Sequence, residues 1–441
     1  MCAVCRSASA PRTGRRKECD ELVRPPRPSS ARPRYATGEG PGTPPLPAAS
    51  APRTALARAV VGRALERLPL TVRPAGEPEF GLGGPELRLH RPDDLYRRIG
   101  AEGLIGFGES YLARDWDAPD LPAVLAVLAD HATTLVPPSL QRLRGLWAPR
   151  HPSQSRNTPT AARANISHHY DLSNDLFALF LDETLTYSSA VFPSLPASWP
   201  DLAAAQRHKI DLLLDLAEVG SGTRVLEIGT GWGELALRAA RRGAHVTTLT
   251  LSTEQRSVAR RRAASSGVSS LVDVQLCDYR EATGRYDAVL SVEMIEAVGE
   301  EFWPRYFTVV DQRLAPGGRA ALQTITMPHD RLRATRRTHT WIQKYIFPGG
   351  LIPSVRAVRD ITERHTALRL SHRDRYGPHY AETLRLWRER FTGHREQVHT
   401  LGFDDSFSRM WTFYLAYCEA GFRSGYLDVQ QLLLTKSGAR R

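Results

Sequence analysis

The chain is poor in the features that mark membrane-spanning, secreted and disulfide-stabilised proteins. Among its 441 residues there is no apolar run of roughly eighteen, the length that crosses a bilayer. The N-terminal region mixes Arg, Lys and Pro without an apolar core, so no secretory signal is visible. The 5 cysteines are scattered, which suits a reducing cytoplasm. Cys2 and Cys5 are spaced as in zinc sites, but no second ligand pair accompanies them, so no metal is expected.

Positive charge is in excess and is concentrated near the N-terminus. The formal net charge is +12, and residues 1–34 hold nine Arg or Lys against three acidic residues. This excess suits an anionic partner, either nucleic acid or acidic phospholipid, and a solvated basic tail without a partner is the alternative. Residues 1–50 have almost no large apolar side chains, so we expect a disordered, Pro-rich basic tail.

The most informative stretch of the sequence runs from Arg224 to Ala236. Its apolar start predicts a strand, Gly229, Gly231 and Gly233 predict a tight turn, and the residues from Glu234 predict a helix. The pattern E-x-G-x-G-x-G resembles motif I of class I S-adenosylmethionine-dependent methyltransferases. The alternative is an ordinary strand–turn–helix whose glycines serve only the turn.

Strands and helices alternate regularly after this unit, which predicts a doubly wound α/β fold with a mostly parallel sheet. We expect a small mixed α/β domain at 51–147, a linker at 148–162 and a catalytic domain at 163–441. In the small domain we expect a helix at 56–68, a short strand pair at 80–89 and further helices. The main elements predicted in the catalytic domain are strands at 245–251, 271–276, 286–292, 319–325 and 426–435, a turn at 316–318, and helices at 203–217, 253–264, 300–314, 385–401 and 407–422.

Four segments follow successive strands and should meet at the carboxyl edge of the sheet, where open α/β sheets bind ligands. Gly229–Gly233 would accept the amino-acid part of a nucleoside cofactor. Thr250–Gln255 would hold a ribose or a carboxylate through hydroxyl and amide groups. Asp278 could accept from an adenine amino group with Tyr279 beside the ring, and Glu293–Gly299 would face the transferred methyl group.

Several longer motifs together carry a family resemblance. From about residue 160 to 435 the chain resembles the cyclopropane fatty acyl phospholipid synthase family, which includes the mycolic acid cyclopropane synthases. Residues 89–93, 104–111, 326–329 and 341–350 make it most similar to the tuberculostearic acid (10-methylstearate) methyltransferase branch. The motifs that carry the resemblance are His168–Asp175, Thr186–Ser189, Glu227–Gly233, Leu251–Gln255, Met294–Gly299 and Ile342–Gly350.

The resemblance implies a seven-stranded class I methyltransferase fold and transfer of a methyl group from S-adenosylmethionine to the cis double bond of an acyl chain in a phospholipid. It makes Glu296 the site carboxylate and Tyr380 an active-site tyrosine. Cys418 falls at the catalytic-cysteine position, although it could equally be an inert buried thiol. Cofactor contacts are expected from Tyr187, Ser188, Glu227, Gly229, Thr230, Gly231, Trp232, Gly233, Thr250, Leu251, Ser252, Gln255, Asp278 and Tyr279.

The substrate side departs from the cyclopropane synthases. Ser189 replaces a cysteine, Ala297 replaces a histidine, and Gln323 stands where another histidine is expected, near Ile325. In the cyclopropane enzymes these positions help to hold a bicarbonate that acts as the base, so a bicarbonate cofactor is in doubt here. The carbocation formed by methyl transfer can close to a ring, or shift a hydride and lose a proton as a methylene branch. We favour the branch, with the ring as the alternative and a separate reductase needed for a 10-methyl product.

Two other classes of function are weaker alternatives. An RNA or protein methyltransferase would suit the basic charge, but amino-group methylases of nucleic acid often carry an Asn/Asp-Pro-Pro-aromatic segment where this chain has Ser291–Glu296. A non-catalytic lipid-binding protein would not need the glycine loop or Glu296. The expected partners are therefore phospholipid acyl chains rather than nucleic acid, with the protein peripheral on the inner face of the membrane; the sequence leaves a homodimer open.

Overall fold

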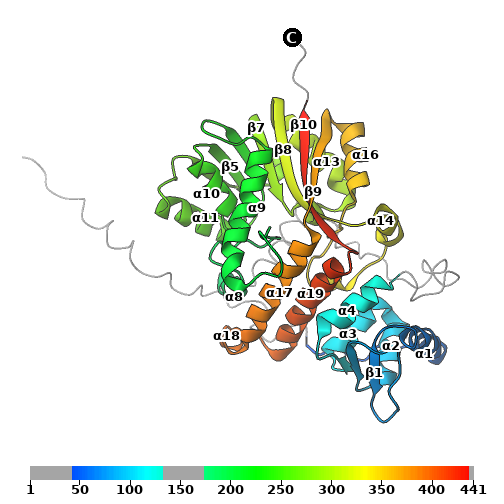
Figure 1. The fold of residues 1–441 in the computed structure, drawn as a ribbon. Helices are drawn as coiled ribbons and strands as arrows, with labels where there is room; N and C mark the ends of the chain where they lie inside the picture. The colour runs from blue at the N-terminus through cyan, green and yellow to red at the C-terminus, as the bar shows by residue number, and fades with distance from the viewer. Residues whose placement is uncertain (1–41, 133–172, 437–441) are drawn as a thin grey trace, which may run out of the picture.

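A seven-stranded sheet forms the centre of the chain in a computed structural model that describes residues 42–132 and 173–436 (Figure 1). The strand order is β6-β5-β4-β7-β8-β10-β9, and only β10 is antiparallel to its neighbours. The doubly wound, mostly parallel fold predicted from the sequence is confirmed. The strands are β4 (Arg224–Ile228), β5 (His245–Thr250), β6 (Val272–Leu276), β7 (Tyr286–Val292), β8 (Leu314–Thr326), β9 (Leu368–Arg375) and β10 (Asp428–Lys436).

Helices cover both faces of this sheet because successive strand residues point to opposite sides. Val225 of β4 packs in one apolar cluster with α9 (Leu202–Leu216) and α10 (Glu234–Arg241). Its neighbours Leu226 and Ile228 pack in the opposite cluster with α13 (Trp303–Arg313) and α16 (Val355–His365). The central strands therefore read as continuous apolar runs, as buried parallel strands do.

The predicted helices of the catalytic part are present, with bounds that differ by a few residues. The helix expected at 385–401 is longer at its start and is divided into α17 and α18. The helix expected at 300–314 begins as a short 3-10 turn before α13. The remaining helices are α8 (Asn174–Phe180), α11 (Thr253–Ser265), α12 (Ile295–Val298), α14 (His329–Thr335), α15 (Trp341–Tyr345), α17 (Gly377–Gly393), α18 (Arg395–Thr400) and α19 (Asp405–Arg423).

Two local sequence predictions were wrong. The turn expected at 316–318 lies within β8 as an irregularity in its pairing, because Tyr286 pairs with Leu314 and Ala288 already pairs with Arg319. The segment 80–89 does not form a strand pair with itself. Instead β2 (Glu86–Leu89) lies parallel to β1 (Thr71–Pro74) and antiparallel to β3 (Trp116–Asp117). The first error came from reading the glycines at 317 and 318 as the end of pairing, and the second from reading the glycines at 81–84 as a hairpin turn.

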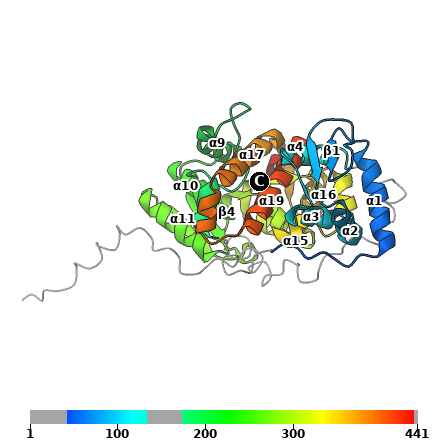
Figure 2. The ribbon, with the colours of Figure 1, turned by 90° about the horizontal axis from the view of Figure 1, so that it is seen from below.

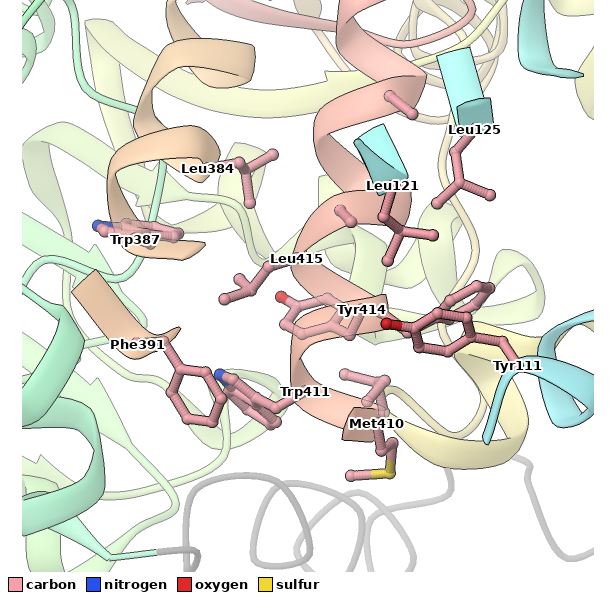
Figure 3. Packing of buried hydrophobic residues seen from close by; sticks show 14 of the residues in the cluster. Tyr111, Leu121, Leu125, Leu384, Trp387, Phe391, Met410, Trp411, Tyr414 and Leu415 are labelled. Atoms are coloured by element: carbon pink, nitrogen blue, oxygen red, sulfur yellow. The ribbon is translucent and has the colours of Figure 1, made fainter. Parts of the chain in front are cut away.

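The N-terminal elements share one hydrophobic core with α17 and α19 rather than having a separate one. In Figure 1 the two helices lie between the large sheet and the N-terminal part, and in Figure 2 α19 runs beside α3 and α4. Figure 3 shows Leu121 and Leu125 of α4 on the side of α19 that carries Tyr414, and Leu384 of α17 on the side of Leu415. The N-terminal helices are α1 (Ala51–Leu65), α2 (Pro92–Glu102), α3 (Leu104–Leu112) and α4 (Leu121–Asp130).

Residues at the end of the predicted tail pack against α2. The guanidinium of Arg98 is buried, pairs with Asp115 at 2.9 Å, and donates to the carbonyls of Pro44 and Pro45. Residues 42–50 therefore belong to the folded part, a correction to the boundary expected at residue 50. Residues 1–41 and the predicted linker 148–162 lie outside the described residues. No helix in the described ranges is long and apolar enough to cross a membrane.

Candidate active site

The glycine loop forms a close turn between β4 and α10. Gly229, Gly231 and Gly233 have φ of +100°, +52° and +97°, a region that L side chains rarely adopt. A Cβ on Gly229 would lie 2.6 Å from Cγ of Met294, and one on Gly233 would lie 3.0 Å from Cβ of Ala259. A Cβ on Gly231 would meet no protein atom within 4 Å. The loop is therefore packed on two sides and open at Gly231.

A pocket lies at this loop and at the carboxyl ends of the neighbouring strands. Eleven of the fourteen cofactor residues expected from the sequence line it together, which is the arrangement that the strand order predicts. They are Tyr187, Ser188, Glu227, Gly229, Thr230, Gly231, Trp232, Thr250, Leu251, Gln255 and Tyr279.

The other three expected cofactor residues do not line this pocket and have structural partners. Gly233 precedes α10 in a left-handed conformation. The hydroxyl of Ser252 accepts from the backbone N–H of Gln255 and caps α11. The carboxylate of Asp278 is engaged by Arg280, through both its backbone N–H and its guanidinium. An interaction of Asp278 with an adenine amino group stays a prediction.

Glu227 carries a buried carboxylate with an unpaired oxygen. Its side chain is 3% exposed, it interacts with Thr248, and its Oε2 has no hydrogen-bond partner. Burial raises the pKa of Glu227 to about 8. An unpaired buried acceptor is costly, and the hydroxyl donors of a ribose would satisfy it. Together with the opening at Gly231, this oxygen fits a nucleoside such as that of S-adenosylmethionine.

A second carboxylate, Glu293, lies at the pocket wall directly after β7. It entered the sequence analysis only as the first residue of the segment Glu293–Gly299, with no role of its own. Oε1 of Glu293 accepts from the backbone N–H of Ser189 and from Nε2 of Gln323, both at 2.9 Å. Its Oε2 accepts from the hydroxyl of Tyr380 at 2.7 Å. Ser189, Gln323 and Tyr380 are thus brought together as the resemblance implies, around a carboxylate that the motif did not single out.

Glu296, the expected site carboxylate, does not line this pocket. Its Oε1 accepts from the backbone N–H of Ile325 and from the hydroxyl of Thr324, the latter at 2.9 Å. Burial raises the pKa of Glu296 to about 8, and the nearby charge of Glu293 contributes to the increase. Its role as catalytic carboxylate stays a prediction. Ala297, the other departure in this turn, is exposed.

Aromatic side chains from distant segments surround the cluster. The hydroxyls of Tyr187 and Tyr414 are 2.7 Å apart, and the ring of Tyr380 lies 4.5 Å from that of Phe422 between centroids. Cys418 lies close enough to Tyr380 to contribute to its electrostatic environment, and burial raises the pKa of the Cys418 thiol to about 12. The thiol is therefore uncharged near neutral pH, which favours the inert reading of Cys418.

Comparison with known proteins decides the family. The family of mycolic acid cyclopropane synthetases matches residues 157–432. The chain belongs to this family. Mycolic acid cyclopropane synthetases and their relatives share both its sequence and its fold, so the family and the class I methyltransferase fold predicted from the motifs are confirmed. The same matches confirm the enzyme class, an S-adenosylmethionine-dependent methyltransferase of fatty acyl lipids.

Three relatives of this synthetase family are informative. The tuberculostearic acid methyltransferase UfaA1 of Mycobacterium tuberculosis is 56% identical over 405 residues, covering 89% of this chain and 93% of the relative. The cyclopropane-fatty-acyl-phospholipid synthase of Escherichia coli is 32% identical over 366 residues, covering 81% and 89%. The structure of mycolic acid cyclopropane synthase CmaA1 complexed with SAH and CTAB matches with 32% identity and a TM-score of 0.57, over 62% of this chain and 98% of that one.

Proposed function

We propose that the chain transfers a methyl group from S-adenosylmethionine to the cis double bond of oleoyl-type acyl chains in phospholipids and forms a 10-methylene-branched fatty acid. The observation that carries the proposal is the meeting, in one pocket, of the glycine loop with Glu293, whose carboxylate accepts from the hydroxyl of Tyr380 behind the pocket wall. The 56% identity with a tuberculostearic acid methyltransferase, against 32% with a cyclopropane synthase, supports the branched product.

The pocket residues suit a reaction in which positive charge develops on an alkene. When bound, S-adenosylmethionine supplies an electrophilic methyl group. Glu227 and the open backbone at Gly231 would hold its nucleoside and amino-acid parts. The ring of Tyr187 on the pocket wall offers an electron-rich face to a carbocation, and the Glu293 carboxylate, to which Tyr380 donates, adds negative charge nearby. Residues 42–132 and 173–436 place no histidine on the wall of this pocket.

The second candidate product is a cyclopropane ring, which the same cation gives if it closes before a hydride shifts. The position of the base relative to the two carbons of the former double bond decides between the ring and the methylene branch. Gln323 hydrogen-bonds to Glu293 and is not basic, so the basic group that the described residues offer at this wall is a carboxylate rather than an imidazole. This difference from the residues of the cyclopropane enzymes is consistent with a different outcome for the cation.

Mass spectrometry of phospholipid fatty acids tests the proposal. Cells rich in oleate would express the chain, and derivatisation would separate an exocyclic methylene from a ring of the same mass. An increase of one CH₂ unit with a methylene signature is expected. A ring would replace the proposed product with the second candidate, and an unchanged fatty acid profile in cells containing folded protein would contradict the proposal.

We propose further that the protein acts at an anionic membrane surface and that a separate reductase saturates the methylene group. The basic excess supports the first part, because clustered Lys and Arg bind acidic lipid in a salt-dependent way. Vesicle co-sedimentation with and without acidic lipid, at low and high salt, is the test. Binding that does not respond to salt would contradict it. A homodimer also stays a proposal, and sedimentation velocity of the purified chain would decide it.

A further inference from the structure

Glu293 is held in a conformation that its residue type disfavours. Its φ is +51°, in the left-handed region that costs an L residue free energy, and its backbone N–H donates to the carbonyl of Gln323 at 2.7 Å. Strained backbone of this kind persists where the surroundings over-determine it, and it gathers at functional sites. The strain turns this carboxylate into the pocket wall directly after β7.

Groups of the protein itself donate hydrogen bonds to both oxygens of the Glu293 carboxylate. Ser189, Gln323 and Tyr380 supply three hydrogen bonds to its two oxygens. The fully buried Lys209 also stabilises its charge, while donating from Nζ to the hydroxyl of Ser188 at 2.6 Å. Glu227 is different, because its free oxygen awaits a donor from outside. Glu293 is therefore preformed and needs no ligand to complete it.

The proposed reaction requires a base close to the transferred methyl group. Addition of a methyl cation to an alkene carbon leaves a carbocation on the acyl chain, and a neutral product forms only when a proton leaves. Among residues 42–132 and 173–436, three carboxylates line the pocket: Glu227, Glu234 and Glu293. Glu234 is ion-paired with Arg262 at 2.5 Å, and Glu227 is positioned for the cofactor. Glu293 is the remaining carboxylate on this wall, and burial raises its pKa, which strengthens it as a base.

A bicarbonate ion, which the resemblance to cyclopropane synthases would imply as the base, does not fit these residues. The donors of Ser189, Gln323 and Tyr380 that could bind an anion are already bound to the Glu293 carboxylate. A second anion would have to lie beside this negative charge in a partly buried site, where like charges repel strongly. The side chain occupies the place of a free anion.

We propose, on the basis of the proposed function, that Glu293 is the catalytic base and that it replaces a dissociable bicarbonate. After a hydride has shifted to the neighbouring carbon, a carboxylate oxygen of Glu293 takes a proton from the new methyl group. The electron pair of that C–H bond becomes the π bond of the exocyclic methylene, and the cation is neutralised. The carboxylic acid then returns its proton to solvent and the charge is restored, with no oxidant or reductant consumed.

Chemical rescue tests this assignment directly. The variant of choice is Glu293→Gly, because glycine adopts φ of +51° without strain and leaves a carboxylate-sized gap beside intact donors. Turnover on dioleoyl phosphatidylglycerol vesicles would be measured in carbon-dioxide-depleted buffer, with and without formate or bicarbonate. Wild-type turnover should not depend on either anion. The variant should lose on the order of a hundredfold or more, the usual contribution of a general base, and should recover when either anion is added.

Two further measurements separate a base from a structural residue. Glu293→Gln keeps the size of the side chain but not its basicity, so removal of a proton from the transferred methyl group should become slower. With a trideuterated methyl donor, the kinetic isotope effect of this variant should therefore exceed that of wild type. Calorimetric affinity for S-adenosylhomocysteine should stay within roughly threefold in both variants, because Glu293 does not hold the cofactor. Glu363→Gln, the same change at an exposed position on α16, is the matched control and should behave as wild type.

The outcomes distinguish this inference from the proposed function. A wild-type protein that makes no branched or cyclic lipid would overturn the proposed function and this inference with it. An active wild type that stops working without bicarbonate would overturn the inference alone. So would full turnover of Glu293→Gly without added anion, or a Glu293→Gly variant that binds the cofactor normally and responds to neither anion.

Discussion

Alanine substitutions in the glycine loop should separate protein stability from cofactor binding. Gly229 and Gly231 both have positive φ, but their surroundings differ. A Cβ on Gly229 would lie 2.6 Å from Cγ and 2.8 Å from Sδ of Met294, whereas a Cβ on Gly231 would point into open space. Gly229→Ala should therefore disturb the protein itself, and Gly231→Ala should mainly obstruct a ligand.

The magnitudes follow from the backbone and packing costs. A non-glycine residue in the left-handed region costs about 1–2 kcal/mol, so Gly231→Ala should lose that much free energy of unfolding. Gly229→Ala adds an overpacking cost of roughly 1–3 kcal/mol and should lose about 2–5 kcal/mol in total. If the methyl of Gly231→Ala occupies space that the cofactor needs, a similar cost of about 1–3 kcal/mol weakens its binding roughly 5- to 150-fold.

Gly267 supplies a matched control. It has φ of +70°, a Cβ placed on it would meet no atom within 4 Å, and it lies between α11 and β6, where it does not line the pocket. Gly267→Ala should match Gly231→Ala in urea denaturation but bind S-adenosylhomocysteine like wild type in calorimetry. Equal affinity of Gly231→Ala and wild type would refute the placement of the cofactor over this loop.

Three further substitutions test other parts of the structure. Cys418→Ala should keep methyl transfer within roughly threefold of wild type, because its buried thiol, with a pKa of about 12, is not a thiolate; a much larger loss with an intact fold would contradict this. Arg98→Ala should cost about 1–3 kcal/mol in urea denaturation, because one oxygen of the buried Asp115 loses its partner while the other keeps Arg91, and an unchanged free energy of unfolding would count against it. Burial raises the pKa of Glu227 from 4.5 to about 8, so the stability from its protonated form is present below 4.5 and lost as pH rises through 8. As pH rises from 4.5 to 8, the melting temperature of Glu227→Gln should therefore fall less than that of wild type. Parallel pH profiles of the two melting temperatures would refute the raised pKa of Glu227.

Local sequence determined the sheet and the cofactor side of the site. The apolar run of β4, the glycines after it and the alternation of strands with helices are patterns within a few residues of one another. Such patterns fix which segments become strands and at which end of each strand a loop emerges. Eleven of the fourteen expected cofactor residues lie on the pocket wall for this reason.

The sequence could not show which glutamate faces the substrate side. Glu293 and Glu296 are three residues apart in the segment Glu293–Gly299, and the family motif Met294–Gly299 favoured Glu296. The direction of Glu293 depends on its left-handed backbone and on its hydrogen bonds to Ser189 and Gln323, which are 104 and 30 residues away. A glutamate directly after the fourth predicted strand was a signal for it, but no local pattern reports where a side chain points once a turn is strained.

The N-terminal part shows the same difference between local sequence patterns and contacts of distant segments. Its helices were visible from their periodicity, yet its boundary and its core were not. Arg409 of α19 lies 3.7 Å from the ring centroid of Tyr111, and Phe413 lies 5.0 Å from the same ring. These contacts join segments about 300 residues apart. Sequence by itself determined the strands, the helices and the cofactor loop, because short-range periodicity and backbone preference specify them. Only the tertiary structure decided the shared core and the carboxylate of the substrate side, because packing between distant segments sets them.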